Sequence, residues 1–316
     1  MSRLTESAAM IEREIEADLD KWETMIVAPE GLGGLPPGGT LIVFSREGVI
    51  KVRGERPAYY PLALPAEVPP DERLIRAKDA EFTRRDLDAA IAAYREAATS
   101  TGRTVRAIAT AGLGRCLRAQ GKMTDALAVY SELATMSEAV VDGVPASVLA
   151  YHEREEIFVA TGDLTHGADE GDRLARYLAA RDVIIEKPAF ERFAEGLATG
   201  RLPAEPLDRA RALFEMWPRL RDMASGRAVA RGGSSAYVAA WRAVDGDSHA
   251  VLAPVDVLMK RARDAADRLA VTIALEDEDA TNATVWGPAP TNADHTSHSL
   301  DRIGLPVRLR LSFKEP

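Results

Sequence analysis

Cysteine is almost absent from this chain, which contains only Cys116 among its 316 residues. A single cysteine cannot form an internal disulfide, so the sequence excludes a fold held together by disulfides. Aromatic residues are also scarce, at 6% of the chain. Because sheets select aromatic and β-branched residues whereas alanine is the strongest helix former, this scarcity favours closely packed helices over a β-sandwich.

Long apolar runs and a basic excess are missing as well. No stretch approaches the roughly 18 apolar residues that a membrane-spanning helix needs. The first residues are acidic and amphipathic, which is not the composition of a signal peptide. The formal net charge is −9, whereas phosphate binding needs a basic face. We therefore expect a soluble chain whose partner is not nucleic acid.

The first 70 residues predict a helix, a hairpin and a linker. Residues 5–27 carry apolar side chains three or four positions apart, the spacing of an amphipathic helix. Residues 41–52 alternate around a turn and predict a β-hairpin, followed by a proline-rich linker over 53–70. Because an isolated hairpin is unstable, we expect it to lie beside the strands predicted after residue 235.

Residues 71–183 are helical and repetitive. Ala90 and Tyr94 recur 36 residues later as Ala126 and Tyr130, with turns in register between the helices. Together with a small residue in the preceding helix, Gly114, this pattern resembles tetratricopeptide repeats, in which antiparallel helix pairs cross at small residues. The segment therefore predicts a short array of helix pairs with Ala90 and Ala126 at the crossings.

The end of the chain changes character. Residues 188–225 continue as helix, whereas the sequence after residue 226 predicts a second hairpin over 236–254, an amphipathic helix and three further strands, with a loop over 287–304 before the last of them. This is the order of a small α+β domain. The predicted fold is thus mainly α with α+β, divided into residues 1–70, 71–226 and 227–316.

No catalytic residue, metal site or cofactor is predicted. His152 and Glu156 share a helix face without a second histidine, and Asp294, His295 and His298 lack a fourth ligand. The acidic run 276–279 lacks the ligand spacing of a calcium loop, and the glycines of 31–39 precede neither a lysine nor a helix. We interpret these residues as parts of solvated surfaces and loops, and we expect Cys116 to be a small core residue.

The candidate ligand-binding residues are four side chains of the C-terminal part, Tyr237, Trp241, Arg242 and Trp286. Aromatic walls with one polar anchor, here Arg242, are typical of ligand pockets. Tyr237 and Trp241 share one face of a predicted strand, whereas Arg242 points to the other. The alternative is that these aromatic residues belong to the core.

The order of the segments resembles the periplasmic sensor region of bacterial transmembrane sensor histidine kinases. The resemblance rests on the Trp22 helix, LPPGGTLIVFSREGV, AYYP, DLDAAIAAYREAA and APVDVLMKRARDAADRL. It implies an extracytoplasmic module tethered between membrane helices, with a PAS- or Cache-like C-terminal domain. Its ligand would be an unknown small molecule or a protein segment, and it would permit a homodimer.

The resemblance implies sensing without catalysis, because the phosphoacceptor helix and the nucleotide-binding boxes of a kinase core are absent from this sequence. The abrupt end after a predicted strand at 305–313 suggests a domain cut from a longer protein. Two other classes stay open. One is a cytosolic tetratricopeptide adaptor that binds a partner's peptide in its groove. The other is a hydrolase or transferase whose site the sequence does not reveal.

Overall fold

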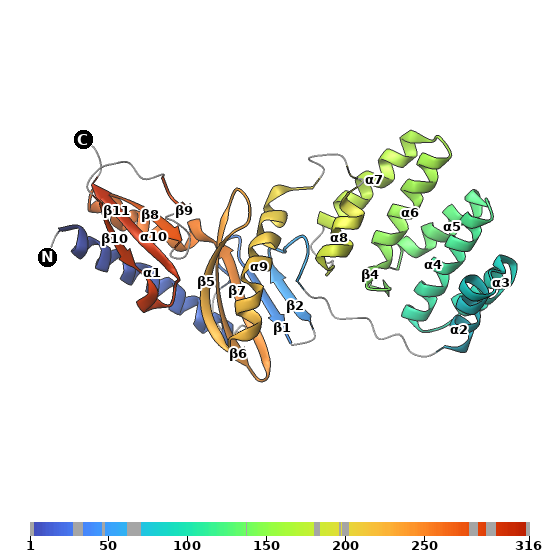
Figure 1. Ribbon diagram of the computed structural model, residues 1–316, viewed down its shortest axis with the longest axis horizontal. Helices are drawn as coiled ribbons and strands as arrows, with labels where there is room; N and C mark the ends of the chain where they lie inside the picture. Colours follow the sequence, from blue (N-terminus) through green and yellow to red (C-terminus); the bar gives the residue numbers. More distant parts are fainter. Residues whose placement is uncertain are drawn as a thin grey trace. The chain divides into compact units, whose positions relative to one another are not determined.

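The computed structural model shows a mixed α+β protein that divides into two compact units. It describes residues 3–27, 34–45, 48–61, 71–136, 138–179, 184–195, 197, 202–277, 284–288 and 295–313. Unit 1 combines residues 1–62 with 204–316, and unit 2 comprises residues 63–203. Figure 1 shows the elements of both units along the chain.

The boundary between the units lies at residue 203, whereas sequence analysis extended the helical array to residue 226. Helix α9 (Ala204–Asp222) is the reason for the difference. It contacts three strands of unit 1 and buries Leu213, Met216 and Leu220. A helix with such an apolar stripe belongs to the sheet that it covers, whatever its neighbours in the chain.

Unit 1 contains a five-stranded antiparallel sheet in the order β2-β1-β7-β6-β5. Its strands are β1 (Thr40–Phe44), β2 (Val49–Gly54), β5 (Ser225–Arg231), β6 (Ala236–Val244) and β7 (Asp247–Pro254). Strand β1 pairs with β7, Thr40 opposite Leu252. This pairing confirms that the N-terminal hairpin lies beside the strands after residue 235, where its backbone groups gain a partner.

A second antiparallel sheet follows the order β10-β11-β8-β9. Its strands are β8 (Val271–Asp277), β9 (Thr284–Trp286), β10 (His295–Ser299) and β11 (Val307–Phe313). The predicted strands at the positions of β8, β9 and β11 are confirmed, whereas β10 was predicted as loop. Its sequence, HTSHS, carries no apolar alternation, and its partner β11 supplies the pairing that makes it a strand.

Two helices contact both sheets and form the main core of unit 1. They are α1 (Arg3–Val27), which confirms the predicted first helix, and α10 (Val255–Arg268). The apolar stripe of α1 is buried, as are apolar residues of α10 and of both sheets. On the other face of the first sheet α9 packs over buried aromatic residues, with the rings of Phe44 and Trp217 4.9 Å apart.

Unit 2 is an array of successive helices. They are α2 (Glu72–Lys78), the π-helical turn Asp79–Thr83, α3 (Leu87–Ala98), α4 (Arg103–Ala119), α5 (Met123–Ala134), α6 (Ala146–Ala160), α7 (Leu164–Ala179) and α8 (Lys187–Ala194). A short hairpin of β3 (Val140–Val141) and β4 (Val144–Pro145) precedes α6. Each helix from α2 to α6 contacts the next one along the chain.

The repeated residues hold neighbouring helices close together. Ala90 and Ala126 are fully buried, as the predicted register requires. A Cβ atom added to Gly114 would lie 2.7 Å from the Tyr130 ring, so this ring packs directly on the backbone of α4. Tyr94 packs on Gly112 in the same way from the other side. Small residues and tyrosines therefore set the helix spacing.

We predict that Ala126→Leu destabilises unit 2 by about 1–3 kcal/mol, because the added volume has no space at a fully buried position. Chemical denaturation measures the free energy of unfolding. Ala128→Leu is the matched control on the exposed face of the same helix. Equal unfolding energies for the two variants would contradict the assigned register.

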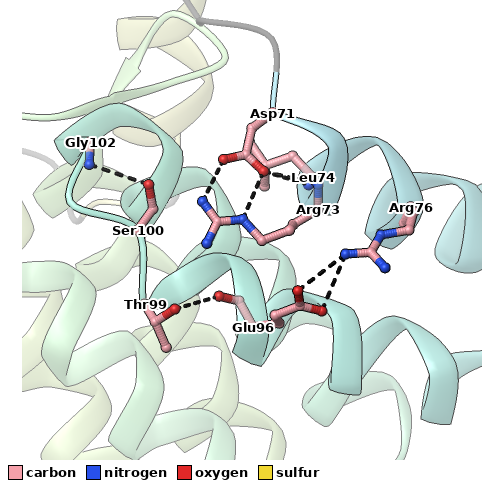
Figure 2. Close-up of polar contacts among 8 residues, drawn as sticks. All are labelled: Asp71, Arg73, Leu74, Arg76, Glu96, Thr99, Ser100 and Gly102. Carbon is pink, nitrogen blue, oxygen red and sulfur yellow. Dashed lines mark hydrogen bonds and ion pairs between the residues drawn. The ribbon is translucent and has the colours of Figure 1, made fainter.

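The first helix of the array begins at a side-chain cap, which Figure 2 shows. The Asp71 carboxylate accepts hydrogen bonds from the backbone N–H groups of Arg73 and Leu74, and pairs with the Arg73 guanidinium at 2.7 Å. These hydrogen bonds, first among them that from the Arg73 side chain, lower the Asp71 pKa to about 2. Arg76 of α2 reaches Glu96 of α3, an exposed pair that adds little stability.

A histidine makes the stability of unit 2 depend on pH. The His152 ring of α6 lies edge-on to Phe193 of α8, with ring centroids 5.1 Å apart. Burial lowers the pKa of His152 below its ordinary value, and this effect outweighs the opposing charges of Glu153 and Glu156. Because the unfolded chain binds this proton more readily, the contribution of His152 is fully present above the unfolded pKa. This contribution to stability is lost as the pH falls toward the pKa of His152 in the folded state.

We therefore predict that unit 2 loses stability between about pH 7 and pH 5, and that His152→Gln reduces this loss. The measurement is the free energy of unfolding as a function of pH for both proteins. His166, an exposed histidine of α7, provides the control substitution His166→Gln. An unchanged pH slope in His152→Gln would contradict the assignment.

Candidate functional site

The structure separates the four residues that sequence analysis grouped together. Tyr237 and Trp241 are each only 1% exposed. The Tyr237 hydroxyl donates to the Glu205 carbonyl oxygen at 3.4 Å, and Trp241 Nε1 donates to the Met223 carbonyl oxygen at 3.0 Å. Arg242 is exposed and Trp286 is half-buried. Tyr237 thus lies in the core under α9, as the alternative interpretation of these aromatic residues expected.

Trp286 lines a pocket of its own, of about 360 Å³, between α10 and the second sheet. Its Nε1 donates to Asp256 Oδ1 at 3.0 Å, and the Arg263 guanidinium lies 5.0 Å from the centre of the ring. This stacking and the ion pair between Arg263 and Asp256 fix the indole. Trp286 therefore does not share a pocket with Arg242.

Trp241 and Arg242 line the same depression, a cleft of about 640 Å³ that we call the Arg242 cleft. Its walls are formed by α1, the end of α9, the start of β5, β6 and the loop before β11. The lining residues are Glu16, Asp20, Glu23, Arg219, Met223, Ser225, Gly226, Arg227, Trp241, Arg242, Asp301, Arg302, Ile303, Gly304 and Pro306.

The cleft lies at the edge of the first sheet. Neighbouring residues of a strand point to opposite faces, so Trp241 faces α9 whereas Arg242 faces α1. One depression reaches both because β5 is the last strand of the sheet and begins at Ser225. Because Gly226 has no side chain, the Trp241 ring can lie against the backbone of β5, where a Cβ atom would be only 2.5 Å from the ring.

Two arginines of the cleft are held by carboxylates of α1. Arg227 is mostly buried and pairs with Asp20 at 2.9 Å and Glu23 at 2.7 Å. It also donates to the Ile303 carbonyl oxygen at 2.7 Å. Its charge and its donors are therefore used to join β5 to α1 and to the loop before β11.

Arg302 belongs to a second network on α1. It donates to Glu12 at 2.9 Å and to Glu16 at 3.1 Å. Glu12 is buried and also bonds the His298 ring through Nε2 at 2.9 Å. His298, considered above as a metal ligand, is thus a partner of a buried carboxylate in this structure.

Arg242 differs from both. Within the part of the chain that the structure describes, no hydrogen bond or ion pair engages its guanidinium, and the same holds for the carboxylate of Asp301. An exposed guanidinium in a cleft offers donors in a planar fork that matches carboxylate and phosphate oxygens. The cleft can therefore hold an anionic group at Arg242.

The other polar clusters serve structural roles. Asp208 is buried, accepts hydrogen bonds from the backbone N–H and hydroxyl of Ser234, and pairs with Arg211. Glu276 pairs with Arg310 at 2.9 Å. Burial raises the pKa of the Cys116 thiol to about 11, which keeps it protonated and unreactive.

Among the described residues no group of three or more His, Cys, Asp or Glu could hold a metal ion. Several sequence candidates lie wholly or partly outside them, namely Asp294, residues 278–279 of the acidic run and residues 31–33 of the glycine segment. No helix in the described part of the chain is long and apolar enough to cross a membrane.

Sequence reasoning missed most of the cleft. It did not predict that Arg227 meets α1, whose residues lie about 200 positions earlier. It placed residues 287–304 in a loop without assigning Asp301 or Arg302 to a site. No local pattern marks these residues, because only the packing of α1 and the loop before β11 brings them to β5.

Unit 2 offers a second surface. The first helices of successive pairs, α2, α4 and α6, approach one another more closely than the second helices α3, α5 and α7 do. Phe82, after α2, is 61% exposed with the Arg115 guanidinium 5.3 Å from its ring centre. Such packing brings the first helices to the inner side of the array.

Comparisons with known proteins identify no relative, since no family profile, no curated protein and no solved structure matches the chain.

Proposed function

We propose that this chain is a non-enzymatic recognition module whose Arg242 cleft binds a ligand through a carboxylate group. The observation that carries the proposal is the uncommitted guanidinium of Arg242 in a cleft of about 640 Å³. Arg227 and Arg302 beside it are paired with carboxylates of α1. The Arg242 guanidinium, which has no partner among the described residues, is therefore the group that a ligand would neutralise.

The charges of the cleft support a ligand of modest negative charge. Four arginines and four carboxylates line it, so it is balanced before a ligand arrives. A bulky polyanion would meet Asp20, Glu23 and Asp301, whereas a single carboxylate can pair with Arg242 alone. Bidentate pairing with arginine gives such a site orientation as well as affinity.

A sensing role fits the position of the cleft in the chain. One wall is α1, near the N-terminus, and another is the loop 301–306, which leads into β11 near the C-terminus. A ligand that binds one arrangement of these walls better than another would shift both ends of unit 1. That the chain is the sensor region of a transmembrane histidine kinase, with a PAS- or Cache-like domain, stays a prediction.

The test is titration of the purified chain with small carboxylates, followed by backbone amide chemical shifts and calorimetry. Arg242→Gln should weaken binding about tenfold or more, since a charge-assisted hydrogen bond contributes about 1.5–3 kcal/mol. Arg53→Gln, on the opposite edge strand β2, is the matched control for the loss of one exposed charge. Equal binding by Arg242→Gln and wild type would refute the proposal.

The close approach of α2, α4 and α6 favours a second candidate function, a tetratricopeptide-like adaptor that binds a peptide on the inner side of the array. In that case Phe82→Ser should weaken peptide binding, whereas Arg242→Gln should not. The outcome of this pair of variants separates the two functions.

A further inference from the structure

Strand β5 leaves a row of backbone groups without partners. Gly232 N–H donates to Ser235 and Ala243 N–H donates to Ala224, so even-numbered residues of β5 face β6. In an antiparallel pair the alternate residues point away from the partner. The N–H and C=O groups of residues 225, 227, 229 and 231 therefore face the open edge, and no described residue bonds them.

Two clefts follow this edge over the whole length of β5. The Arg242 cleft covers its first half, Ser225 to Arg227. A second cleft of about 270 Å³ covers its second half, Val229 to Arg231. Arg219 and Pro306 line both clefts, which are therefore adjacent, and we call the two together the groove.

The groove is walled on both sides of the sheet. One wall is α9, which contributes Met216 and Arg219. The other is formed by α1 at one end and by Val285 and Val307 of the second sheet at the other. A strand added to β5 would lie about 4.8 Å from it, between these walls.

Charged side chains lie at both ends of the groove. Arg242 lies opposite Ser225, at the start of β5. At the other end lie the carboxylates of Glu215 and Asp277, together with the arginines Arg219 and Arg231. Burial, and then the neighbouring charge of Asp277, raises the pKa of Glu215, against the opposing effect of Arg219.

From these four observations we propose that an extended peptide segment adds to β5 as an antiparallel strand, with its C-terminal carboxylate at Arg242. An antiparallel strand runs from Arg231 toward Ser225 and so ends beside the guanidinium. A basic side chain earlier in the peptide faces Glu215 and Asp277, and an apolar one lies between them, against Val285 and Val307. The inference rests on the proposed function, since it names the carboxylate that Arg242 holds.

The probe is a randomised library of synthetic peptides about seven residues long, the length of β5, with free C-termini. It is applied to the purified full chain. Selected peptides should carry a basic residue N-terminal to an apolar one, and amidation of the C-terminus should weaken them about tenfold. Arg242→Gln should weaken the free peptides and leave the amidated ones unchanged.

Backbone pairing has two tests of its own, one on the peptide and one on the protein. N-methylation of alternate peptide residues in one register should abolish binding, whereas methylation in the other register should not, because only every second N–H faces β5. Val229→Pro, which removes one outward N–H of β5, should also abolish binding if the variant keeps the wild-type spectrum.

The outcomes distinguish the two proposals. Small carboxylates that bind through Arg242 while no peptide does would overturn the strand addition and keep the proposed function. Peptides that tolerate methylation in both registers would also overturn the strand addition. A concentration-dependent dimer that Val229→Pro dissociates, without peptide binding, would assign the edge to a second copy and refute the inference.

Discussion

Gly232→Ala is expected to destabilise unit 1 by about 3 kcal/mol or more. A Cβ atom at Gly232 would overlap the backbone carbonyl of Asp208. Backbone atoms within a helix cannot move aside as the end of a flexible side chain can. The substitution must therefore lift the turn between β5 and β6 away from α9.

The loss has a second component. Once the turn moves, Ser234 can no longer donate its backbone N–H and its hydroxyl to Asp208, whose carboxylate is buried. A buried carboxylate without these donors costs about 1–3 kcal/mol. The free energy of unfolding, measured by chemical denaturation, would report both contributions together.

Gly246→Ala is the matched control. Gly246 lies in the turn between β6 and β7 at φ +95°, with open space where its Cβ atom would be. Only backbone strain, about 1–2 kcal/mol, opposes that substitution. A loss at Gly232 no larger than that at Gly246 would contradict the close approach of the turn to α9.

Trp241→Ala is expected to cost unit 1 about 3–5 kcal/mol of unfolding free energy. The indole is fully buried, packs on the backbone of Gly226, and donates to the Met223 carbonyl oxygen at the end of α9. Its removal leaves a cavity and an unpaired carbonyl, which the flanking small residues cannot fill.

The neighbouring substitution Arg242→Ala serves as the control, because Arg242 is exposed and engages no described residue. It should change stability by no more than about 0.5 kcal/mol while reducing carboxylate binding. A large loss of stability in Arg242→Ala, or a small one in Trp241→Ala, would show that the two residues have exchanged roles.

Much of the fold could be predicted from local patterns. The stripe of Ile11, Ile15 and Leu19 specifies the first helix, since its spacing matches the helical period. The alternation around residues 41–52 specifies the hairpin. The recurrence of Ala90 and Tyr94 specifies the helix pairs of unit 2. In each case the pattern lies within one element or within elements that are neighbours along the chain.

Two of the strands described in unit 1 escaped prediction for one reason. Strands β5 and β10 are short and rich in polar or small residues, and neither alternates strongly between apolar and polar residues. They are strands because β6 and β11 present ladders that pair with them. Local propensity for strands is weak, and the partner decides.

The candidate site was predicted only in part. Trp241 and Arg242 do line one cleft, whereas Tyr237 is enclosed by α9 and Trp286 lies in another pocket. The alternation of a strand shows that Trp241 and Arg242 point to opposite faces. It does not show that their strand lies beside the edge of its sheet, where one cleft reaches both faces.

The sequence by itself determined the helices, the hairpins, the repeat and the low content of reactive groups, because these depend on residue type and on spacing along the chain. Only the tertiary structure decided that α9 leaves the array for the sheet, that β5 forms an open edge, and that Arg242 pairs with none of the described residues while Arg227 and Arg302 are engaged. These features depend on which elements meet in space. That the hairpin at 41–52 lies beside the strands after residue 235 was predicted from the sequence, but no local pattern encodes which strand ends the sheet or which helices cover it.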